Sequence, residues 1–254
     1  MHKTIDLNCD MGESFGVYKL GYDDEVIPLV SSVNIACGFH GGDPNVMDHT
    51  VAMAKKHNVG IGVHPGFPDL IGFGRRNMDV SRKDLMNMII YQIGALHAFC
   101  EKHGTKLQHI KPHGQMNNLA DGDAAFADNI VDAVLAVRPD LPMYVKPNSE
   151  LHKRSEKKGL PFVLEIFADR AYNDDLSLVS RKIEGAVISD LNKVADRVLK
   201  MVTEQKVVTI TGNEIEVSGQ TICVHGDTPA ALEMIRAIRR RLEAMDVKIA
   251  APFA

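Results

Sequence analysis

Acids, histidines and basic residues in this 254-residue chain gather directly after short apolar runs. The clearest example is the run from Val33 to Cys37, which is followed by glycines, His40 and Asp43. Carboxylates and imidazoles are the side chains that most often transfer protons in enzymes, and both also bind divalent metals. A lysine or arginine beside them can stabilise a developing negative charge. These residue types predict hydrolytic chemistry where the apolar runs end.

An apolar run with a polar ending occurs six times along the chain. The polar residues at these endings are Asp10 and Glu13, His40 and Asp43, His64, Lys111 and His113, Asp169 and Arg170, and His225 and Asp227. Any single one has a structural alternative, such as Asp43 capping a helix that begins at Pro44. Burying the whole set without a task would be costly. We therefore expect these side chains to share one face and to form an active site.

The elements that must position these residues are buried strands separated by helices. Seven strand candidates, most of them followed by a helical stripe, predict an α/β fold in which parallel strands close into an irregular (β/α) barrel. An open doubly wound sheet is the alternative. We favour the barrel because it gathers all strand endings at one mouth, whereas an open sheet scatters those far from its switch point. We expect one domain over residues 1–254.

Two connections depart from the strand and helix repeat. The segment 65–80 is a long loop with aromatic residues, glycines and the pair Arg75 and Arg76, and we expect it to cover the mouth of the barrel. A β-hairpin insertion is predicted near 206–219, because the sequence alternates on both sides of Thr211-Gly212-Asn213.

Composition and charge exclude several classes of function. The chain has 45% hydrophobic and 24% charged residues with a net charge of -4, so it lacks the basic footprint of a nucleic-acid-binding protein. No apolar run approaches the roughly 20 residues that span a bilayer. The first residues lack the apolar core of a signal peptide, and we expect a cytoplasmic protein without a membrane partner. The four cysteines lack paired metal or redox spacing, and we interpret them as buried thiols.

Two mechanisms are compatible with the polar residues. In the first, Asp10, Glu13 or a histidine activates water as a general base, and Lys111, Arg170 or Arg75 stabilises negative charge. In the second, Asp10, His40 and His64 bind a divalent metal that activates the water. The second has the weaker sequence signal, because the chain has no H-E-x-x-H motif. A phosphate loop of the G-x-x-x-x-G-K-[ST] type is also absent.

Several stretches together resemble the LamB/YcsF family, and they follow one another from Asp6 to the last helix. These stretches are 6–13, 34–44, 64–76, 111–114, 167–170 and 223–227. The resemblance implies a barrel similar to that of glycoside hydrolases and deacetylases. It also implies ATP-dependent opening of 5-oxo-L-proline to L-glutamate in a complex with the B and C subunits of a 5-oxoprolinase. ATP is then a cofactor of the complex, which is consistent with the missing phosphate loop.

On this resemblance we expect two groups of site residues. The catalytic group is Asp10, Glu13, His40, His64, Lys111, His113 and Asp169. The group that binds substrate or phosphate is Asn8, Asn34, Arg75, Arg76, Arg170, Arg181, His225 and Asp227. We expect Asp10 or Glu13 to act as the base or to orient a histidine. We expect the histidines to surround the reacting carbon, and Lys111 with Arg170 to bind a carboxylate or phosphate.

Two departures from the family pattern and several alternatives remain. The loop 173–181 lacks the Gly and Pro that the family leads us to expect. After 111–114 the family typically continues with Ala-Leu-Tyr-Asn, where this chain has Gln115-Met116-Asn117-Asn118, which puts the packing of the substrate in doubt. A metal-dependent deacetylase or amidohydrolase acting on a carbohydrate or small amide is one alternative function. A non-catalytic protein that delivers a small-molecule substrate to its partners is another. The sequence leaves open whether the chain forms a homo-oligomer.

Overall fold

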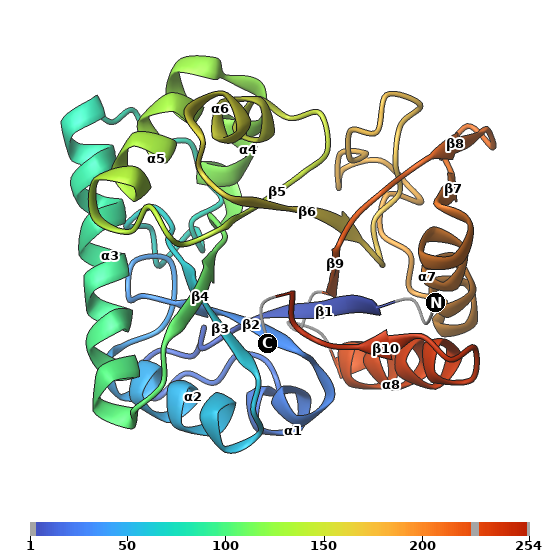
Figure 1. Cartoon of the computed structure of the whole chain (residues 1–254), viewed down its shortest axis with the longest axis horizontal. Helices are drawn as coiled ribbons and strands as arrows, with labels where there is room; N and C mark the ends of the chain where they lie inside the picture. Colours follow the sequence, from blue (N-terminus) through green and yellow to red (C-terminus); the bar gives the residue numbers. More distant parts are fainter. Residues whose placement is uncertain (1–3, 225–228, 253–254) are drawn as a thin grey trace.

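A computed structural model describes residues 4–224 and 229–252 and shows a closed ring of parallel strands. The ring consists, in order, of β1 (Thr4–Met11), β2 (Ser32–Ala36), β3 (Gly60–His64), β4 (Leu107–Ile110), β5 (Met143–Val145), β6 (Phe162–Phe167) and β9 (Thr221–Val224). It closes because β1 pairs in parallel with both β2 and β9 (Figure 1). The prediction of an irregular seven-stranded (β/α) barrel is confirmed.

The strands are buried on both faces, which explains their apolar sequences. Every residue of β2, β3 and β9 is buried, because one face of each strand points into the barrel and the other packs against helices. Strand register sets Asp10 beside Asn34 and Asn8 beside Cys223. Residues paired in register on parallel strands point to the same face of the sheet. The polar side chains at these positions therefore form layers inside the barrel.

The barrel is least regular around β4. This strand pairs with β5 only through Ile110 and Met143. Its register against β3 shifts between Ile61 and Gly62. A Cβ atom at Gly62 would lie 2.0 Å from Nε2 of His109. Glycine is required at this position because the His109 ring crosses the space that any side chain would fill.

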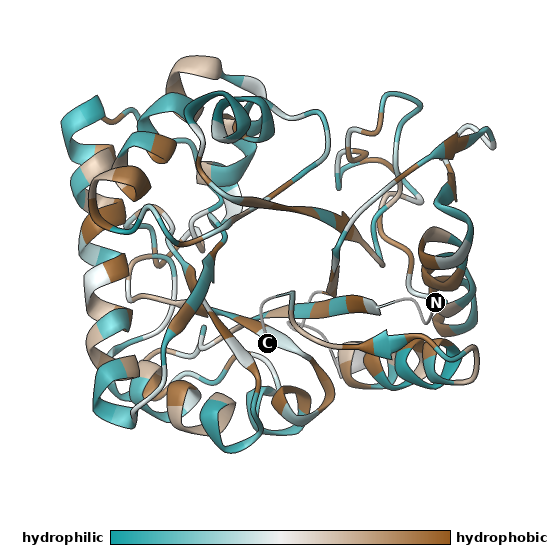
Figure 2. Ribbon diagram, in the orientation of Figure 1, coloured by the Kyte–Doolittle hydropathy of each residue, from teal (hydrophilic) through white to brown (hydrophobic). Residues whose placement is uncertain are grey.

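Helices form an outer layer around the strands (Figure 1). They are α1 (Asp23–Val26), α2 (Pro44–Lys56), α3 (Arg82–His103), α4 (Gly114–Gly122), α5 (Ala124–Val137), α6 (Glu150–Lys158), α7 (Leu191–Glu204) and α8 (Pro229–Glu243), with a short 3-10 helix at Ile27–Leu29. Hydrophobic and hydrophilic residues alternate along these ribbons in Figure 2, as expected for helices that face a core on one side. Asp43 caps α2 by accepting hydrogen bonds from the backbone of Asn45 and Val46.

Three further features complete the fold. The short strands β7 (Lys206–Val208) and β8 (Glu214–Glu216) pair in antiparallel fashion outside the barrel. Strand β10 (Lys248–Ile249) adds to the edge of β1, and helix α4 follows directly after His113; neither was expected from the sequence. No helix in the described part of the chain is long and apolar enough to cross a membrane.

Candidate active site

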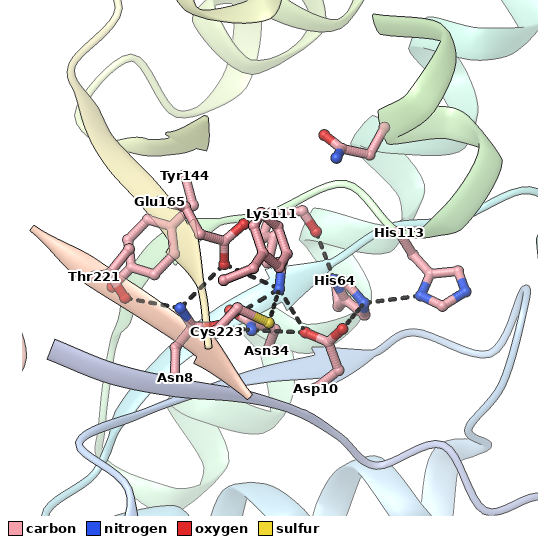
Figure 3. A network of polar contacts seen from close by, with 12 residues as sticks. Asn8, Asp10, Asn34, His64, Lys111, His113, Tyr144, Glu165, Thr221 and Cys223 are labelled. Carbon is pink, nitrogen blue, oxygen red and sulfur yellow. Dashed lines mark hydrogen bonds and ion pairs between the residues drawn. The ribbon is translucent and has the colours of Figure 1, made fainter. Parts of the chain in front are cut away.

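A buried lysine lies at the centre of the carboxyl ends of the strands (Figure 3). The Nζ atom of Lys111 is 2.9 Å from Oδ1 of Asp10 and 3.0 Å from Oε1 of Glu165. It also lies 3.1 Å from Sγ of Cys223. Lys111 directly follows β4, whereas these three partners come from β1, β6 and β9. Closure of the barrel is what brings them together.

The electrostatics of this cluster keep Lys111 charged. Burial disfavours its ammonium form, but the charges of Asp10 and Glu165 outweigh burial and raise the pKa of Lys111 well above its usual value. Burial also raises the pKa of Cys223 well above that of an ordinary thiol. Lys111 therefore serves as a fixed positive charge rather than as a base, and Cys223 remains a thiol.

A layer of amides beneath Lys111 orients the two carboxylates (Figure 3). Asn34 donates hydrogen bonds of 2.8 Å to Oδ1 of Asp10 and to Oδ1 of Asn8. Asn8 in turn donates to Oε1 of Glu165 at 3.0 Å and to Oγ1 of Thr221 at 2.7 Å. Asn8 and Asn34, which we expected to bind substrate, are fully buried, and their contacts position Asp10 and Glu165.

Beside the lysine, two histidines face each other (Figure 3). Nε2 of His64 lies 2.9 Å from Nδ1 of His113 and 3.4 Å from Oδ2 of Asp10. The other nitrogen of each ring contacts a backbone carbonyl. Nδ1 of His64 lies 2.7 Å from the carbonyl oxygen of Lys111, and Nε2 of His113 lies 2.9 Å from that of Phe73. Both rings are thereby fixed in orientation.

Glu13 and His40 complete this group of imidazoles. The His40 ring stacks on His113 with centroids 3.6 Å apart and planes 1° apart. Oε1 of Glu13 lies 3.4 Å from Nε2 of His40 and 3.7 Å from Nδ1 of His113. Burial lowers the pKa of His40 well below its usual value and that of His113 to about 3. Both rings are therefore neutral near pH 7.

These four residues could hold a metal ion. One ligand atom each from Glu13, His40, His64 and His113 lies within 4.8 Å of all the others. Neutral imidazoles and a carboxylate are the ligands that divalent transition metals take. The group differs from the set expected from the sequence, because Glu13 and His113 join it. Asp10 instead lies beside it, paired with Lys111.

Above Lys111 lies an open pocket with about 710 Å³ of empty space. Asp10, His64 and Lys111 lie in its lining, and its cationic side chains are Lys111, Arg75, Lys146, Arg170 and Arg181. Arg170 is braced by a 2.6 Å hydrogen bond that it donates to the carbonyl of Val179, and burial lowers its pKa. Because cations outnumber acids in the lining, the pocket suits a small anionic molecule.

The remaining residues expected at the site lie elsewhere or outside the described chain. Arg76 forms an ion pair with Asp69 within the loop after β3, and its side chain is 63% exposed. Asp169 is buried and does not line the pocket. His225 and Asp227 lie outside the described residues. The structure thus separates Arg76 from the other arginines expected to bind substrate.

Sequence reasoning missed Glu165 and Lys146. Glu165 is a single acid within the apolar run 162–167, and it is only 2% exposed. A charge in the middle of a strand that is otherwise buried predicts an inward-facing partner, and this signal could have identified it. Lys146 directly follows β5, the one strand to which we assigned no histidine or acid at its end.

The backbone after β3 approaches His40 too closely for any side chain at Gly66. A Cβ atom there would lie 2.4 Å from Nδ1 of His40. Gln92 holds this backbone in place by accepting from the Gly66 N–H at 2.9 Å and donating to its carbonyl at 3.1 Å. We expect Gly66→Ala to displace His40, to destabilise the fold by about 1–3 kcal/mol, and to lower turnover at least tenfold.

Urea unfolding and steady-state kinetics measure these two effects. The matched control is Gly94→Ala, because a Cβ atom at Gly94 meets nothing within 4 Å. This position lies inside α3, where alanine is favoured over glycine by about 1 kcal/mol, so the control should be as stable as the parent or more so. Equal behaviour of the two variants would contradict the close packing of His40.

A closed parallel barrel with charged residues at the carboxyl ends of the strands places this chain among the (β/α)-barrel proteins. The sequence model of the LamB/YcsF family matches residues 5–254, and the chain belongs to this family. The resemblance seen in the sequence is thus confirmed.

Relatives of the chain are similar to it over almost their whole length. The A subunit of the 5-oxoprolinase of Clostridium beijerinckii is 51% identical, with 96% of each chain covered. The crystal structure of a lactam utilization protein from Thermus thermophilus superposes with a TM-score of 0.94 at 45% identity, covering 98% of this chain and 99% of that one. The name of the first relative identifies it as one member of an assembly, and that of the second connects it with lactams.

A more distant similarity concerns the fold alone. A family 4 carbohydrate esterase from Streptomyces lividans superposes with a TM-score of 0.53 at 9% identity, covering 98% of this chain and 92% of the esterase. The barrel therefore has the same fold as that esterase, in line with the barrel type that the resemblance to the family implied.

Proposed function

We propose that this chain is the A component of a multi-subunit 5-oxoprolinase and that it takes part in the ATP-dependent opening of 5-oxo-L-proline to L-glutamate. The observation that carries this proposal is the permanently charged Lys111, held between Asp10 and Glu165 at the floor of a cationic pocket. Relatives whose names describe a 5-oxoprolinase component and a lactam utilization protein support it.

The pocket suits the charge of the proposed substrate. 5-Oxoproline carries one carboxylate, and Arg170, Arg181 and Lys146 line the wall of the pocket. Arginine pairs with carboxylates in bidentate fashion, which would fix the orientation of the lactam ring. Asn117 and Asn118 also line this pocket, in the segment where the sequence departs from the family pattern. These two amides would contact the ring or its activated form.

The residues around Lys111 supply the groups that opening an amide requires. Oδ2 of Asp10, which lies 3.4 Å from Nε2 of His64, would remove the proton from the attacking water. The ammonium of Lys111 would stabilise the negative charge on the oxygen atoms of the activated amide when water adds to its carbon. The proton taken from water would then pass to the ring nitrogen as the C–N bond breaks.

ATP enters this proposal through the complex. A five-membered lactam closes readily, so its opening at neutral pH needs a driving force. Phosphorylation of the amide oxygen supplies it. A first water would add to the activated carbon, the C–N bond would break to leave an acyl phosphate, and a second water would release the phosphate, so that one 5-oxoproline, one ATP and two waters give one glutamate, one ADP and one phosphate. The chain has no phosphate loop, and we propose that the B and C subunits bind the nucleotide. We also propose that the complex works in the cytoplasm.

We propose a divalent metal as a further cofactor of this enzyme. The residues that could hold it also support a second candidate function. The group of Glu13, His40, His64 and His113 could hold a metal ion, which would polarise a carbonyl and lower the pKa of water. A metal-dependent deacetylase or amidohydrolase acting on a carbohydrate or small amide would use the same group. Such an enzyme would work without ATP and would lose activity to a chelator.

The experiment that tests the proposal measures glutamate formation from 5-oxoproline and ATP. The purified chain is compared with the chain mixed with its B and C partners, and the mixture without ATP is the control. We expect turnover only in the complete mixture with ATP. Absence of glutamate in every mixture would overturn the proposal, and release of acetate from acetylated sugars without ATP would establish the second candidate.

A further inference from the structure

We propose that Glu13, His40, His64 and His113 form a binding site for one transition-metal ion of the zinc class, with the two backbone-anchored histidines as its principal ligands. This inference deepens the proposed function by naming the metal's ligands and chemical class. It does not require that a lactam be the substrate, because binding can be measured without one.

The first argument concerns the hydrogens on the two facing rings. A carbonyl oxygen only accepts hydrogen bonds, so the nitrogens that contact the carbonyls of Lys111 and Phe73 carry the N–H. A neutral imidazole has one N–H. In the neutral form of both rings, Nε2 of His64 and Nδ1 of His113 each present a lone pair to the other at 2.9 Å. Two lone pairs at this distance repel, and a metal ion bound to both nitrogens from one side removes the repulsion.

The way in which the two facing rings are anchored is itself typical of metal ligands. Metal-binding histidines typically donate their second N–H to a carbonyl or carboxylate, as His64 and His113 do here.

The second argument is the spacing of the ligand atoms. Four ligands at about 2.0–2.1 Å from a tetrahedral zinc lie roughly 3.3 Å from one another. The observed separations are 2.9 Å for the two facing nitrogens, 3.4 Å from Glu13 to His40, and 3.7 Å from Glu13 to His113. These three values bracket the ideal separation. All four ligand atoms lie within 4.8 Å of one another, so binding of one ion would draw the wider pairs together by rotation of the side chains.

The third argument is that His40 is buried without hydrogen-bond partners. Neither of its ring nitrogens makes a hydrogen bond within the described residues, although the side chain is fully buried. Buried polar atoms without partners are rare and costly. Because the His40 and His113 rings are parallel, their lone pairs are parallel too. Binding of His40 to the same ion would therefore require its ring to tilt out of the stack.

The ligand set selects the class of metal. Three imidazoles with one carboxylate suit zinc, cobalt, nickel or iron, whereas magnesium and calcium require sites built from oxygen atoms. The ion would lie beside Asp10, whose Oδ2 is 3.4 Å from Nε2 of His64. Its position would thus border the pocket that contains Lys111.

The test is metal binding by the purified chain in the absence of substrate. The protein is treated with a chelator, dialysed and titrated with Co²⁺ while its visible absorption is recorded, and Zn²⁺ is then added in competition. We expect one equivalent of Co²⁺ to give the intense bands of a low-coordinate site and one equivalent of Zn²⁺ to displace it. Mg²⁺ at the same concentration should not compete.

Three variants and one control locate the site. We expect His64→Leu and His113→Leu to weaken Co²⁺ binding at least 100-fold. Glu13→Gln, which keeps the shape of the side chain, should weaken it about 10- to 100-fold. The control is His49→Gln, which removes an exposed histidine paired with Asp24 and should bind like the parent. Circular dichroism of the metal-free proteins checks folding, and Glu13→Gln decides the case if a leucine variant does not fold.

The outcomes separate the inference from the proposed function. Equal Co²⁺ binding by the parent and the folded variants, or no saturable binding at all, would overturn the metal site and leave a proton shared between His64, His113 and Asp10 in its place. Glutamate formation by such a metal-free complex would leave the proposed function standing. Stoichiometric metal binding without glutamate formation would overturn only the function.

Discussion

Lys111→Met is expected to abolish turnover, by 10³-fold or more, and to destabilise the fold by about 3–5 kcal/mol. The lysine is 5% exposed, and its Nζ lies within 3.0 Å of both Asp10 and Glu165. Without the ammonium, two buried carboxylates lie close together with no positive charge between them. The loss of charge stabilisation in the transition state typically lowers the rate by about 10²–10³ by itself. Displacement of the two repelling carboxylates adds to this loss.

A second substitution separates the structural effect from the chemical one. Lys111→Met combined with Glu165→Gln removes one carboxylate together with the ammonium, while the glutamine can still accept the hydrogen bond that Asn8 donates. We expect urea unfolding to show most of the stability restored in the double variant, and glutamate formation to remain lost. A double variant that regains turnover would show that Lys111 acts only through folding.

Asp10→Asn is the second change with a large expected effect. We expect kcat to fall by about 10²–10⁴ and KM to change by only a few-fold, because the loss of a general base affects the transition state rather than binding. The asparagine oxygen can still accept the hydrogen bond from Asn34, so the strand register should persist. Its amide cannot take a proton from water beside His64.

Kinetics of the assembled complex at saturating ATP measure this effect. The control is Asp48→Asn, a surface carboxylate of α2 that pairs with Lys102 and His103. Turnover that matches the parent, with only KM raised, would contradict a catalytic role for Asp10. It would support the alternative in which this chain only delivers substrate to its partners.

The barrel could be predicted because its signals are local. Each strand is a short buried run, each polar ending follows directly, and helical stripes such as Leu85, Ile89, Ile93 and Leu96 lie between them. Helix α4 was missed because only Met116 and Ala120 of its nine residues are buried, which is too few for a visible stripe. Strand β10 has two residues and no sequence pattern of its own.

The candidate site was predicted in part. The polar endings correctly placed Asp10, His64, Lys111 and His113 around one mouth, where all four line the pocket. Arg75 and Arg76 are adjacent in sequence but do not share a role, because Arg75 lines the pocket whereas Arg76 pairs with Asp69. The direction of a side chain within a long loop depends on its contacts, which residue types alone do not specify.

The sequence by itself determined the family, the class of fold and the set of residues available for chemistry, because these depend on local periodicity and on motifs. Only the tertiary structure decided which of those residues are neighbours. Asn8 meets Glu165 across 157 positions, and His64 meets His113 across 49. Such contacts are fixed by the closure and register of the barrel, which depend on all the strands at once. The same closure buries Lys111 between two acids and brings Nε2 of His64 face to face with Nδ1 of His113.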